Sequence, residues 1–250
     1  MAQTKSVPAA AAADKKVAVG ITAVFVTYFI AQFFMNAINI AQPKTVEEFN
    51  GMALFAWLIA LPALGSAVAT LMFGKFSDMY GRRAILLVSL GLFLVGLVLA
   101  AIATSMAFEI AARVVVALGQ GALAPLCFSI IGDLFEPAAR AKWSGMLNLP
   151  AGIAATIAPT LSGMITESST GWRGLFWLTA PFVLISGVLV ALGLPGQKEK
   201  VSQKVDYLGV VVMVVASAAL IFGFSWLGAP ATRVMGIGLL VVAALAWWGF

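Results

Sequence analysis

The 250-residue sequence contains no histidine and a single cysteine, Cys127. The absence of histidine excludes histidine-based acid–base catalysis, the serine–histidine triad and histidine zinc ligands. One cysteine can form neither an internal disulfide nor a cysteine metal cluster, and Cys127 lies in an apolar stretch where we expect a small buried side chain. With no nucleophile–base pair and no phosphate-cradling loop, the sequence indicates that the chain is not an enzyme and predicts no cofactor and no metal.

Charge is also scarce. Charged residues make up 10% of the chain, hydrophobic residues make up 62%, and the mean hydropathy is +1.04. A soluble domain has about 25% charged residues, and one water-soluble core cannot absorb so many apolar side chains. The net charge is +5, but no basic stripe with interleaved aromatic residues accompanies it, so we expect no nucleic-acid partner. The partner that this composition predicts is the lipid bilayer.

The apolar residues fall into long runs. A helix of about 20 apolar residues spans a bilayer core of about 30 Å. Backbone groups in lipid must be paired within the segment, and these runs lack the period-two alternation of barrel strands, so we expect helices. The sequence thus predicts an all-α polytopic membrane protein with eight spans: 17–40, 52–73, 84–104, 108–131, 144–165, 175–194, 207–227 and 234–250.

The distribution of basic residues predicts the orientation, because lysine and arginine concentrate in cytoplasmic loops. Three basic residues fall on one side of the predicted spans, namely Lys44, Arg173 and Arg233. The other side carries Lys5, Lys15, Lys16, Lys75, Arg82, Arg83, Arg140, Lys142, Lys198, Lys200 and Lys204. We therefore expect a multi-pass protein of the cell (plasma or inner) membrane with its N-terminus in the cytoplasm.

Loops between the predicted spans are short, so consecutive helices are expected to be antiparallel neighbours. The segment 196–206 (GQKEKVSQKVD) is rich in charge and is typical of a solvated linker. We predict a cytoplasmic tail (1–16), a six-helix bundle (17–195), a cytoplasmic linker (196–206) and two further spans (207–250), the last cut by the chain end.

The segment Gly74–Arg83 (GKFSDMYGRR) lies between the second and third predicted spans. It resembles the G-x-x-x-D-x-x-G-R-[RK] loop of the major facilitator superfamily, with Gly74, Asp78, Gly81, Arg82 and Arg83 in register. Glycines at these two positions permit a tight turn, and Asp78 is expected just before a helix start, where a carboxylate is favoured. The resemblance implies a gating loop at the inner surface.

Four other segments extend the resemblance. RVVVALGQGALAP, from Arg113 to Pro125, is similar to the family motif of the fourth span, and WRGLFWLTAPF, from Trp172, is similar to the start of the sixth. VDYLGVVVMVV, after the linker, resembles the start of an extra pair of spans in the 14-span drug:proton antiporters. Glycine-rich span five is similar to the antiporter motif. The helix-packing positions that follow are Gly119, Gly121, Gly145, Gly152, Pro159 and Gly163, because small residues allow helices to approach closely in lipid.

The resemblance implies a major-facilitator-type six-helix bundle followed by two further spans. It also implies a secondary active transporter that moves a small organic solute or drug by alternating access, as an efflux antiporter. A C-terminal half would lie beyond this chain, and protons or another coupling ion would be partners. The alternative is a non-transporting assembly or sensor protein that keeps the bundle, and the open reading frame past codon 250 distinguishes the two.

Polar residues in the predicted spans are the candidates for a substrate cavity, because family cavities lie near the midplane between bundles. Gln32, Asn36 and Asn39 share one helical face of the first span, and Arg113 lies in the fourth. Two other interpretations are open. The amides could be interhelical hydrogen-bonding groups, and Arg113 with Glu109, four residues earlier, could form a pair that extends outward to the membrane surface.

The first span departs from the antiporter pattern. The segment FFMNAINIAQP keeps Asn39, Ala41 and Pro43 but has Phe34 where these antiporters carry a membrane aspartate. All the acidic residues, Glu109 included, are expected near the two surfaces, whereas a proton relay group generally needs burial. The sequence thus predicts no membrane-embedded carboxylate in this half, so that a coupling proton would bind beyond residue 250 unless Glu109 moves inward with Arg113.

Overall fold

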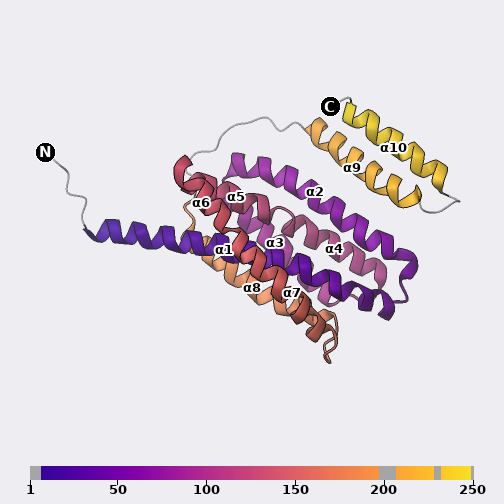
Figure 1. The fold of residues 1–250 in the computed structure, drawn as a ribbon, viewed down its shortest axis with the longest axis horizontal. Helices are drawn as coiled ribbons and strands as arrows, with labels where there is room; N and C mark the ends of the chain where they lie inside the picture. Colours follow the sequence, from indigo (N-terminus) through magenta and orange to yellow (C-terminus); the bar gives the residue numbers. More distant parts are fainter. Residues whose placement is uncertain (1–6, 197–206, 228–231, 249–250) are drawn as a thin grey trace.

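The computed structural model describes residues 7–196, 207–227 and 232–248, and these residues form helices without any strand (Figure 1). Six segments within them are long and apolar enough to cross a membrane. This confirms the predicted all-α bundle of six spans. The helices are α1 (Val7–Glu48), the short 3-10 helix η1 (Met52–Leu54), α2 (Phe55–Tyr80), α3 (Arg82–Ala101), α4 (Met106–Gln120), α5 (Leu123–Leu134), α6 (Pro137–Met146), α7 (Asn148–Thr166), α8 (Arg173–Gly193), α9 (Tyr207–Leu227) and α10 (Arg233–Trp248).

Several helices extend past their predicted ends. Helix α1 begins at Val7, within the predicted tail, and its start projects beyond the bundle (Figure 1). Helix α2 continues to Tyr80, so that the predicted loop after the second span shrinks to Gly81. Helices α9 and α10 pair with each other, and α9 lies along α2 (Figure 1). Of the predicted linker, Gly196 is described and the other residues lie outside the described ranges.

The fourth and fifth spans are each broken into two helices, which the sequence did not predict. The fourth comprises α4 and α5 and the fifth comprises α6 and α7. Pro125 and Pro150 lie in the first turns of α5 and α7, just after the breaks. Proline lacks an N–H and clashes with the preceding turn, whereas it fits the first turn of a new helix.

Helix α1 is the centre of the bundle. It packs against α7, α8 and α5 and forms hydrogen bonds with four other helices along its length. These bonds are Thr27 Oγ1 with Ser186 Oγ of α8 (2.6 Å), Ser162 Oγ of α7 to the Ala37 carbonyl (2.6 Å), Gln120 Nε2 of α4 to the Ala31 carbonyl (2.9 Å) and Cys127 Sγ of α5 to the Val24 carbonyl (3.6 Å). Cys127 is buried as expected.

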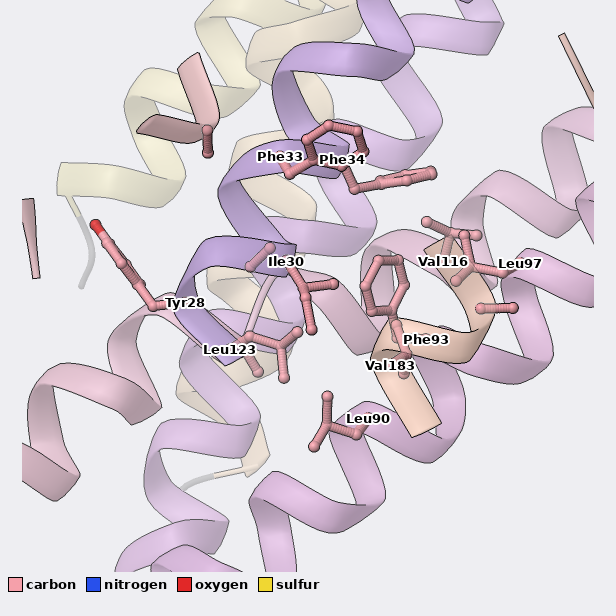
Figure 2. Close-up of a cluster of buried hydrophobic side chains, with 14 of the residues drawn as sticks. Tyr28, Ile30, Phe33, Phe34, Leu90, Phe93, Leu97, Val116, Leu123 and Val183 are labelled. Carbon is pink, nitrogen blue, oxygen red and sulfur yellow. The ribbon is translucent and has the colours of Figure 1, made fainter. Parts of the chain in front are cut away.

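The core contains an aromatic group where α1, α3 and α8 meet. The ring of Phe34 lies edge-on to that of Phe93, with centroids 5.2 Å apart, and 5.8 Å from that of Phe176. Figure 2 shows Phe34 and Phe93 facing each other amid buried aliphatic side chains. All three rings are at most 2% exposed. Such edge-to-face pairs add to the gain from burial.

Close helix packing occurs at two of the predicted glycines. A Cβ atom on Gly119 would lie 2.2 Å from the Phe93 backbone nitrogen of α3, and one on Gly121 would lie 2.4 Å from Ser66 Oγ of α2. Helix α3 contributes a reciprocal site, where a Cβ on Gly96 would lie 2.4 Å from the Val116 backbone nitrogen. Gly119 and Gly121 both lie where another helix approaches too closely for a side chain.

The packing prediction for α6 and α7 is wrong for the residues that the structure describes. No atom lies within 4 Å of a Cβ built on Gly145, Gly152 or Gly163, and Pro159 is exposed. The opposite side of α7 packs against α1 through a stripe of small residues four apart, Ala154, Ala158 and Ser162, all 0% exposed. Small residues do mediate the contact between α7 and α1, but these residues are alanines and a serine rather than the predicted glycines.

Candidate functional site

A cavity of about 490 Å³ opens between α1, α2 and α4. It brings together three of the four predicted residues, Gln32, Asn39 and Arg113. Asn36 is not in the lining, because the cavity-lining positions of α1 centre on a face turned away from it. The full lining is Ala31, Gln32, Phe34, Met35, Ile38, Asn39, Gln42, Leu58, Ile59, Pro62, Ala63, Ser66, Arg113, Val116, Ala117, Gln120, Gly121 and Ala124.

Three polar lining residues, Gln42, Ser66 and Gln120, are not among those predicted from the sequence. Two of them carry a signal that helical spacing provides. Gln42 follows Asn39 by three residues, and Gln120 follows Arg113 by seven, so each shares the face of a predicted residue. Ser66 carries no such signal, because no other polar residue of α2 lines this cavity among the residues that the structure describes.

Three of the amide side chains that line the cavity donate hydrogen bonds to the protein through their NH2 groups. Gln32 Nε2 donates to the Tyr28 hydroxyl at 3.2 Å, Asn39 Nδ2 to the Met35 carbonyl at 3.1 Å, and Gln120 Nε2 to the Ala31 carbonyl at 2.9 Å. The carbonyl oxygen of each amide is therefore the group available to a ligand. The predicted amides Gln32, Asn36 and Asn39 donate within α1 and not to another helix of the described part of the chain. The interhelical bond is made by Gln120, which joins α4 to α1.

Arg113 and Glu109 form an ion pair within α4, with 3.4 Å between Arg113 Nε and Glu109 Oε1. Glu109 is 0% and Arg113 is 4% exposed. Neither oxygen of Glu109 has a hydrogen-bond partner among the described residues. Glu109 lies in the first turn of α4, at the end of the span where the sequence places it. The pair is buried, however, so that the interpretation of an exposed pair that extends outward is wrong. This face of α4 is turned inward, since Met106 and Ile110 beside Glu109 are also buried, against Leu58 and Val46.

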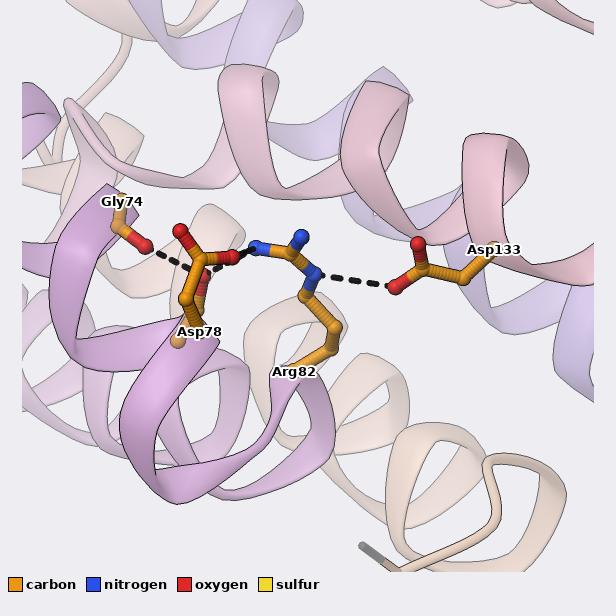
Figure 3. A network of polar contacts seen from close by, with 5 residues as sticks. Gly74, Asp78, Arg82 and Asp133 are labelled. Carbon is orange, nitrogen blue, oxygen red and sulfur yellow. Dashed lines mark hydrogen bonds and ion pairs between the residues drawn. The ribbon is translucent and has the colours of Figure 1, made fainter. Parts of the chain in front are cut away.

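A second cavity, of about 450 Å³, is lined by charged residues that join α2, α3 and α5. Arg82 lies at the start of α3 and contacts Asp78 of α2 (Nη1 to Oδ1, 2.5 Å) and Asp133 of α5 (Nε to Oδ2, 3.0 Å). Arg82 also donates to Ser77 Oγ at 2.6 Å, which itself donates to the Gly74 carbonyl at 2.6 Å (Figure 3). We name this set the Arg82 cluster, and its side of the bundle the Arg82 end.

The Arg82 cluster corrects two roles assigned from the motif. Gly74 lies inside helix α2 rather than in a turn. Of the two motif glycines, only Gly81, with φ of 98°, adopts a conformation that favours glycine. Asp78 lies in the last turn of α2. It therefore lacks the favourable dipole interaction that a carboxylate has at the start of a helix. Its carboxylate is paired with Arg82 instead. Arg83 lines the same cavity, and Asp133 is a member that the motif does not contain.

A third polar cluster joins α1, α8 and the turn before α4 at the opposite side of the bundle, which we name the Glu48 end. The Glu48 carboxylate accepts hydrogen bonds from Trp172 Nε1 and from Arg173 Nη1, both at 2.6 Å. Arg173 Nη2 donates to the Ala103 carbonyl at 2.8 Å, and its guanidinium lies 4.2 Å from the Trp172 ring centroid. Trp172 and Arg173 belong to a motif that the sequence displays, but their partner Glu48 could not be predicted from it.

Residues 24–206 match the Major Facilitator Superfamily. The chain belongs to this family. Among curated relatives, the chain is 32% identical over 212 residues to "Multidrug resistance protein 3" of Bacillus subtilis, covering 84% of this chain and 41% of the relative. It is 31% identical over 198 residues to "Lincomycin resistance protein LmrB" of the same organism, covering 79% and 41%. The chain thus spans about two fifths of the length of these relatives.

Two solved transporter structures share the fold. The peptide transporter PepTSo superimposes with a TM-score of 0.63 at 18% identity, covering 91% of this chain and 52% of that one. The human organic anion transporter MFSD10 superimposes with a TM-score of 0.58 at 16% identity, covering 91% and 72%. The family match confirms the resemblance stated from the sequence, and the superpositions confirm the fold.

Proposed function

We propose that this superfamily chain forms the N-terminal bundle of a secondary active transporter that moves a small organic solute or drug by alternating access. The observation that supports this most directly is the cavity between α1, α2 and α4, where amides and one arginine face a space otherwise lined by apolar side chains. Polar groups inside a membrane protein are costly and mark solute pathways. A mostly apolar lining with a few polar groups suits an organic ligand.

The direction that we propose is efflux by antiport. The relatives that support it are those named for resistance to drugs, Multidrug resistance protein 3 and LmrB. In a two-bundle transporter, the cavity described here would be one wall of the substrate site, and the C-terminal half would supply the other. The coupling ion that we propose is the proton.

Transport tests this proposal directly. The protein as encoded by its gene, reconstituted in vesicles, should move ethidium against its gradient when a pH gradient is imposed. Asn39→Ala, in the cavity, should raise the ethidium concentration that gives half-maximal transport. Asn148→Ala serves as a matched control, because Asn148 is an exposed amide outside the cavity. If the reconstituted protein moves no ethidium under the pH gradient, the result would support the assembly or sensor alternative.

We also propose that the Arg82 end faces the cytoplasm in the plasma or inner membrane, because basic residues concentrate there. Met79→Cys and Thr170→Cys, each in a Cys127→Ala background, place one thiol at each end of the bundle. In intact cells an impermeant thiol reagent should label the protein carrying Thr170→Cys but not the one carrying Met79→Cys. Labelling of both from the same side contradicts the orientation.

A further inference from the structure

The break between α4 and α5 lies in the wall of the cavity. Helix α4 ends at Gln120 and α5 begins at Leu123, and the lining includes Gln120, Gly121 and Ala124. In an unbroken helix the N–H of Ala124 would donate to the carbonyl of Gln120, four residues earlier. That hydrogen bond is absent, and neither backbone group has another partner among the described residues. The wall therefore presents one unpaired backbone donor and one unpaired backbone acceptor.

The two groups face the cavity because of their register. A backbone C=O points along a helix toward the N–H four residues later, so both groups lie on the face that the two residues share. Gln120 and Ala124 both line the cavity, and both are partly exposed. The N–H of Ala124 and the C=O of Gln120 thus point toward each other across the break. A single oxygen atom placed between them can bond to both.

Three features of the chain keep the break open. Pro125 has no N–H to donate to the Gly121 carbonyl, and its ring clashes with the preceding turn. Thr70 of α2 replaces the missing donor, because its Oγ1 donates to the Gly121 carbonyl at 3.0 Å. Gly121 lets α2 approach, since a Cβ atom at that position would lie 2.4 Å from Ser66 Oγ. The break is therefore built into the packing of α2 against the fourth span.

Other polar groups lie near the break on the cavity side. The Ser66 hydroxyl lies against it, and the Gln120 side chain donates to the Ala31 carbonyl, which leaves its own oxygen as an acceptor. Further along the same face of α4 lies Arg113, which is 4% exposed and whose Nε makes no hydrogen bond to the described residues. Buried polar groups without partners are costly in a membrane protein. The cavity thus offers hydrogen bonds that a purely apolar ligand cannot make.

We propose that the break is a binding subsite for a hydroxyl group of the transported solute. The hydroxyl oxygen accepts from the Ala124 N–H, and its O–H donates to the Gln120 backbone carbonyl. Water that enters the cavity can make the same two bonds, so a ligand hydroxyl that displaces it keeps them and a methyl group does not. The inference rests on the proposed function and deepens it, because it names hydroxyl-bearing organic solutes as the class that the cavity prefers.

A hydroxyl group suits the break better than other polar groups of organic solutes. A carboxylate or an ether oxygen accepts but cannot donate, and an ammonium group donates but cannot accept. Each of these would leave one of the two backbone groups unpaired, at a cost that offsets the gain from the other bond. A carboxamide has both functions, but on two different atoms, whereas the two backbone groups point at one position.

Two phosphonium probes of the same shape and charge test this inference. Both are tetraphenylphosphonium ions, one with a para-hydroxymethyl group on one ring and the other with a para-ethyl group in its place. Equilibrium dialysis measures the binding of each probe to the purified protein as encoded by its gene. The readout is the ratio of the two affinities, compared between the unaltered protein and a variant that closes the break.

Pro125→Ala is that variant, because it supplies the missing N–H and lets the helix pair Gln120 with Ala124. Relative to Pro125→Ala, the unaltered protein should favour the hydroxymethyl probe over the ethyl probe by about tenfold or more. Pro181→Ala is the matched control and should behave as the unaltered protein, because Pro181 is an exposed proline inside α8, outside the cavity lining. The same ratio in Pro125→Ala and in the unaltered protein overturns the inference.

Hydrogen exchange in the unaltered protein keeps the test valid if Pro125→Ala fails to fold. Mass spectrometry of peptides that span residues 122–126 reports on the exchange of the Ala124 amide. The bound hydroxymethyl probe should slow this exchange by about tenfold more than the bound ethyl probe does, because it alone bonds to the N–H. Equal slowing by both probes, or slowing by neither, overturns the inference.

The two proposals fail separately. If the hydroxymethyl probe is preferred as expected but the protein moves no ethidium in vesicles, the transport function is wrong and the hydroxyl subsite stands. If ethidium is transported but the ratio of the two probes is the same with and without the break, the subsite is wrong and the transport function stands.

Discussion

Gly119 provides a sharp test of how α3 and α4 pack. A methyl group at this position would meet three backbone atoms of α3, the nitrogen of Phe93 at 2.2 Å, the oxygen of Ser89 at 2.6 Å and the Cα of Phe93 at 2.7 Å. None of these can rotate away as the end of a side chain could. To bring the closest contact from 2.2 Å to an ordinary 3.4 Å, the helices must open by about 1.2 Å.

The expected cost of Gly119→Ala follows from this opening. Overpacking of this kind costs about 1–3 kcal/mol of unfolding free energy, partly offset by the better helix propensity of alanine, about 1 kcal/mol. Gly91→Ala is the matched control, because Gly91 lies on α3 with no atom within 4 Å of the position that its methyl group would take. The propensity gain is common to both, so their difference isolates the packing cost of about 1–3 kcal/mol.

Thermal unfolding in detergent measures that difference. At about 2–4 °C per kcal/mol for a chain of this size, Tm of Gly119→Ala should be about 2–12 °C below that of Gly91→Ala. Size-exclusion chromatography checks that both variants are monodisperse before heating. Equal Tm values for the two variants would show that the close contact between α3 and α4 does not exist, and the reasoning from Gly119 would be refuted.

Two other predictions concern the polar clusters at the ends of the bundle. Asp78→Asn should impair transport more than expression, because its pair with Arg82 is partly exposed and contributes only about 0.2–1 kcal/mol; vesicle transport normalised to protein amount measures this, and full transport would leave Asp78 a purely structural role. Arg173→Lys should lower Tm by about 2–6 °C although it keeps the charge, because lysine cannot bind Glu48 and the Ala103 carbonyl together while stacking on Trp172. A Tm equal to that of the unaltered protein would show that charge alone matters at that position.

The sequence predicts the spans well because hydrophobic length is a local property of the chain. It also predicts which residues of one helix share a face, so that spacing alone places Gln32 and Asn39 together. It does not tell which face of a helix is turned inward, since this depends on the neighbouring helices. For this reason the burial of Glu109, and the contact of α7 through Ala154 rather than Gly152, could be seen only in the structure.

Motif matches show the same limit. The spacing of GKFSDMYGRR identifies the family, but the roles that the motif suggests for Gly74 and Asp78 assume a loop that helix α2 replaces. Asp133 is 51 residues away from Arg82 in the sequence. No local sequence pattern connects the two residues. Phe34 in place of an aspartate suggests the loss of an embedded acid, whereas a buried acid is present at Glu109, on a different helix of the same bundle.

The hydrogen bonds that α1 makes with α4, α5, α7 and α8 limit how this bundle can move. They are spread over the depth of the helix, from Val24 to Ala37, so a rotation or slide of α1 alone would break several of them at once. The bond from Gln120 to Ala31 links α1, which carries Gln32 and Asn39, to α4, which carries Arg113. A solute that meets this wall from either side of the membrane would find the same geometry, and access would change only by displacement of the wall as one piece.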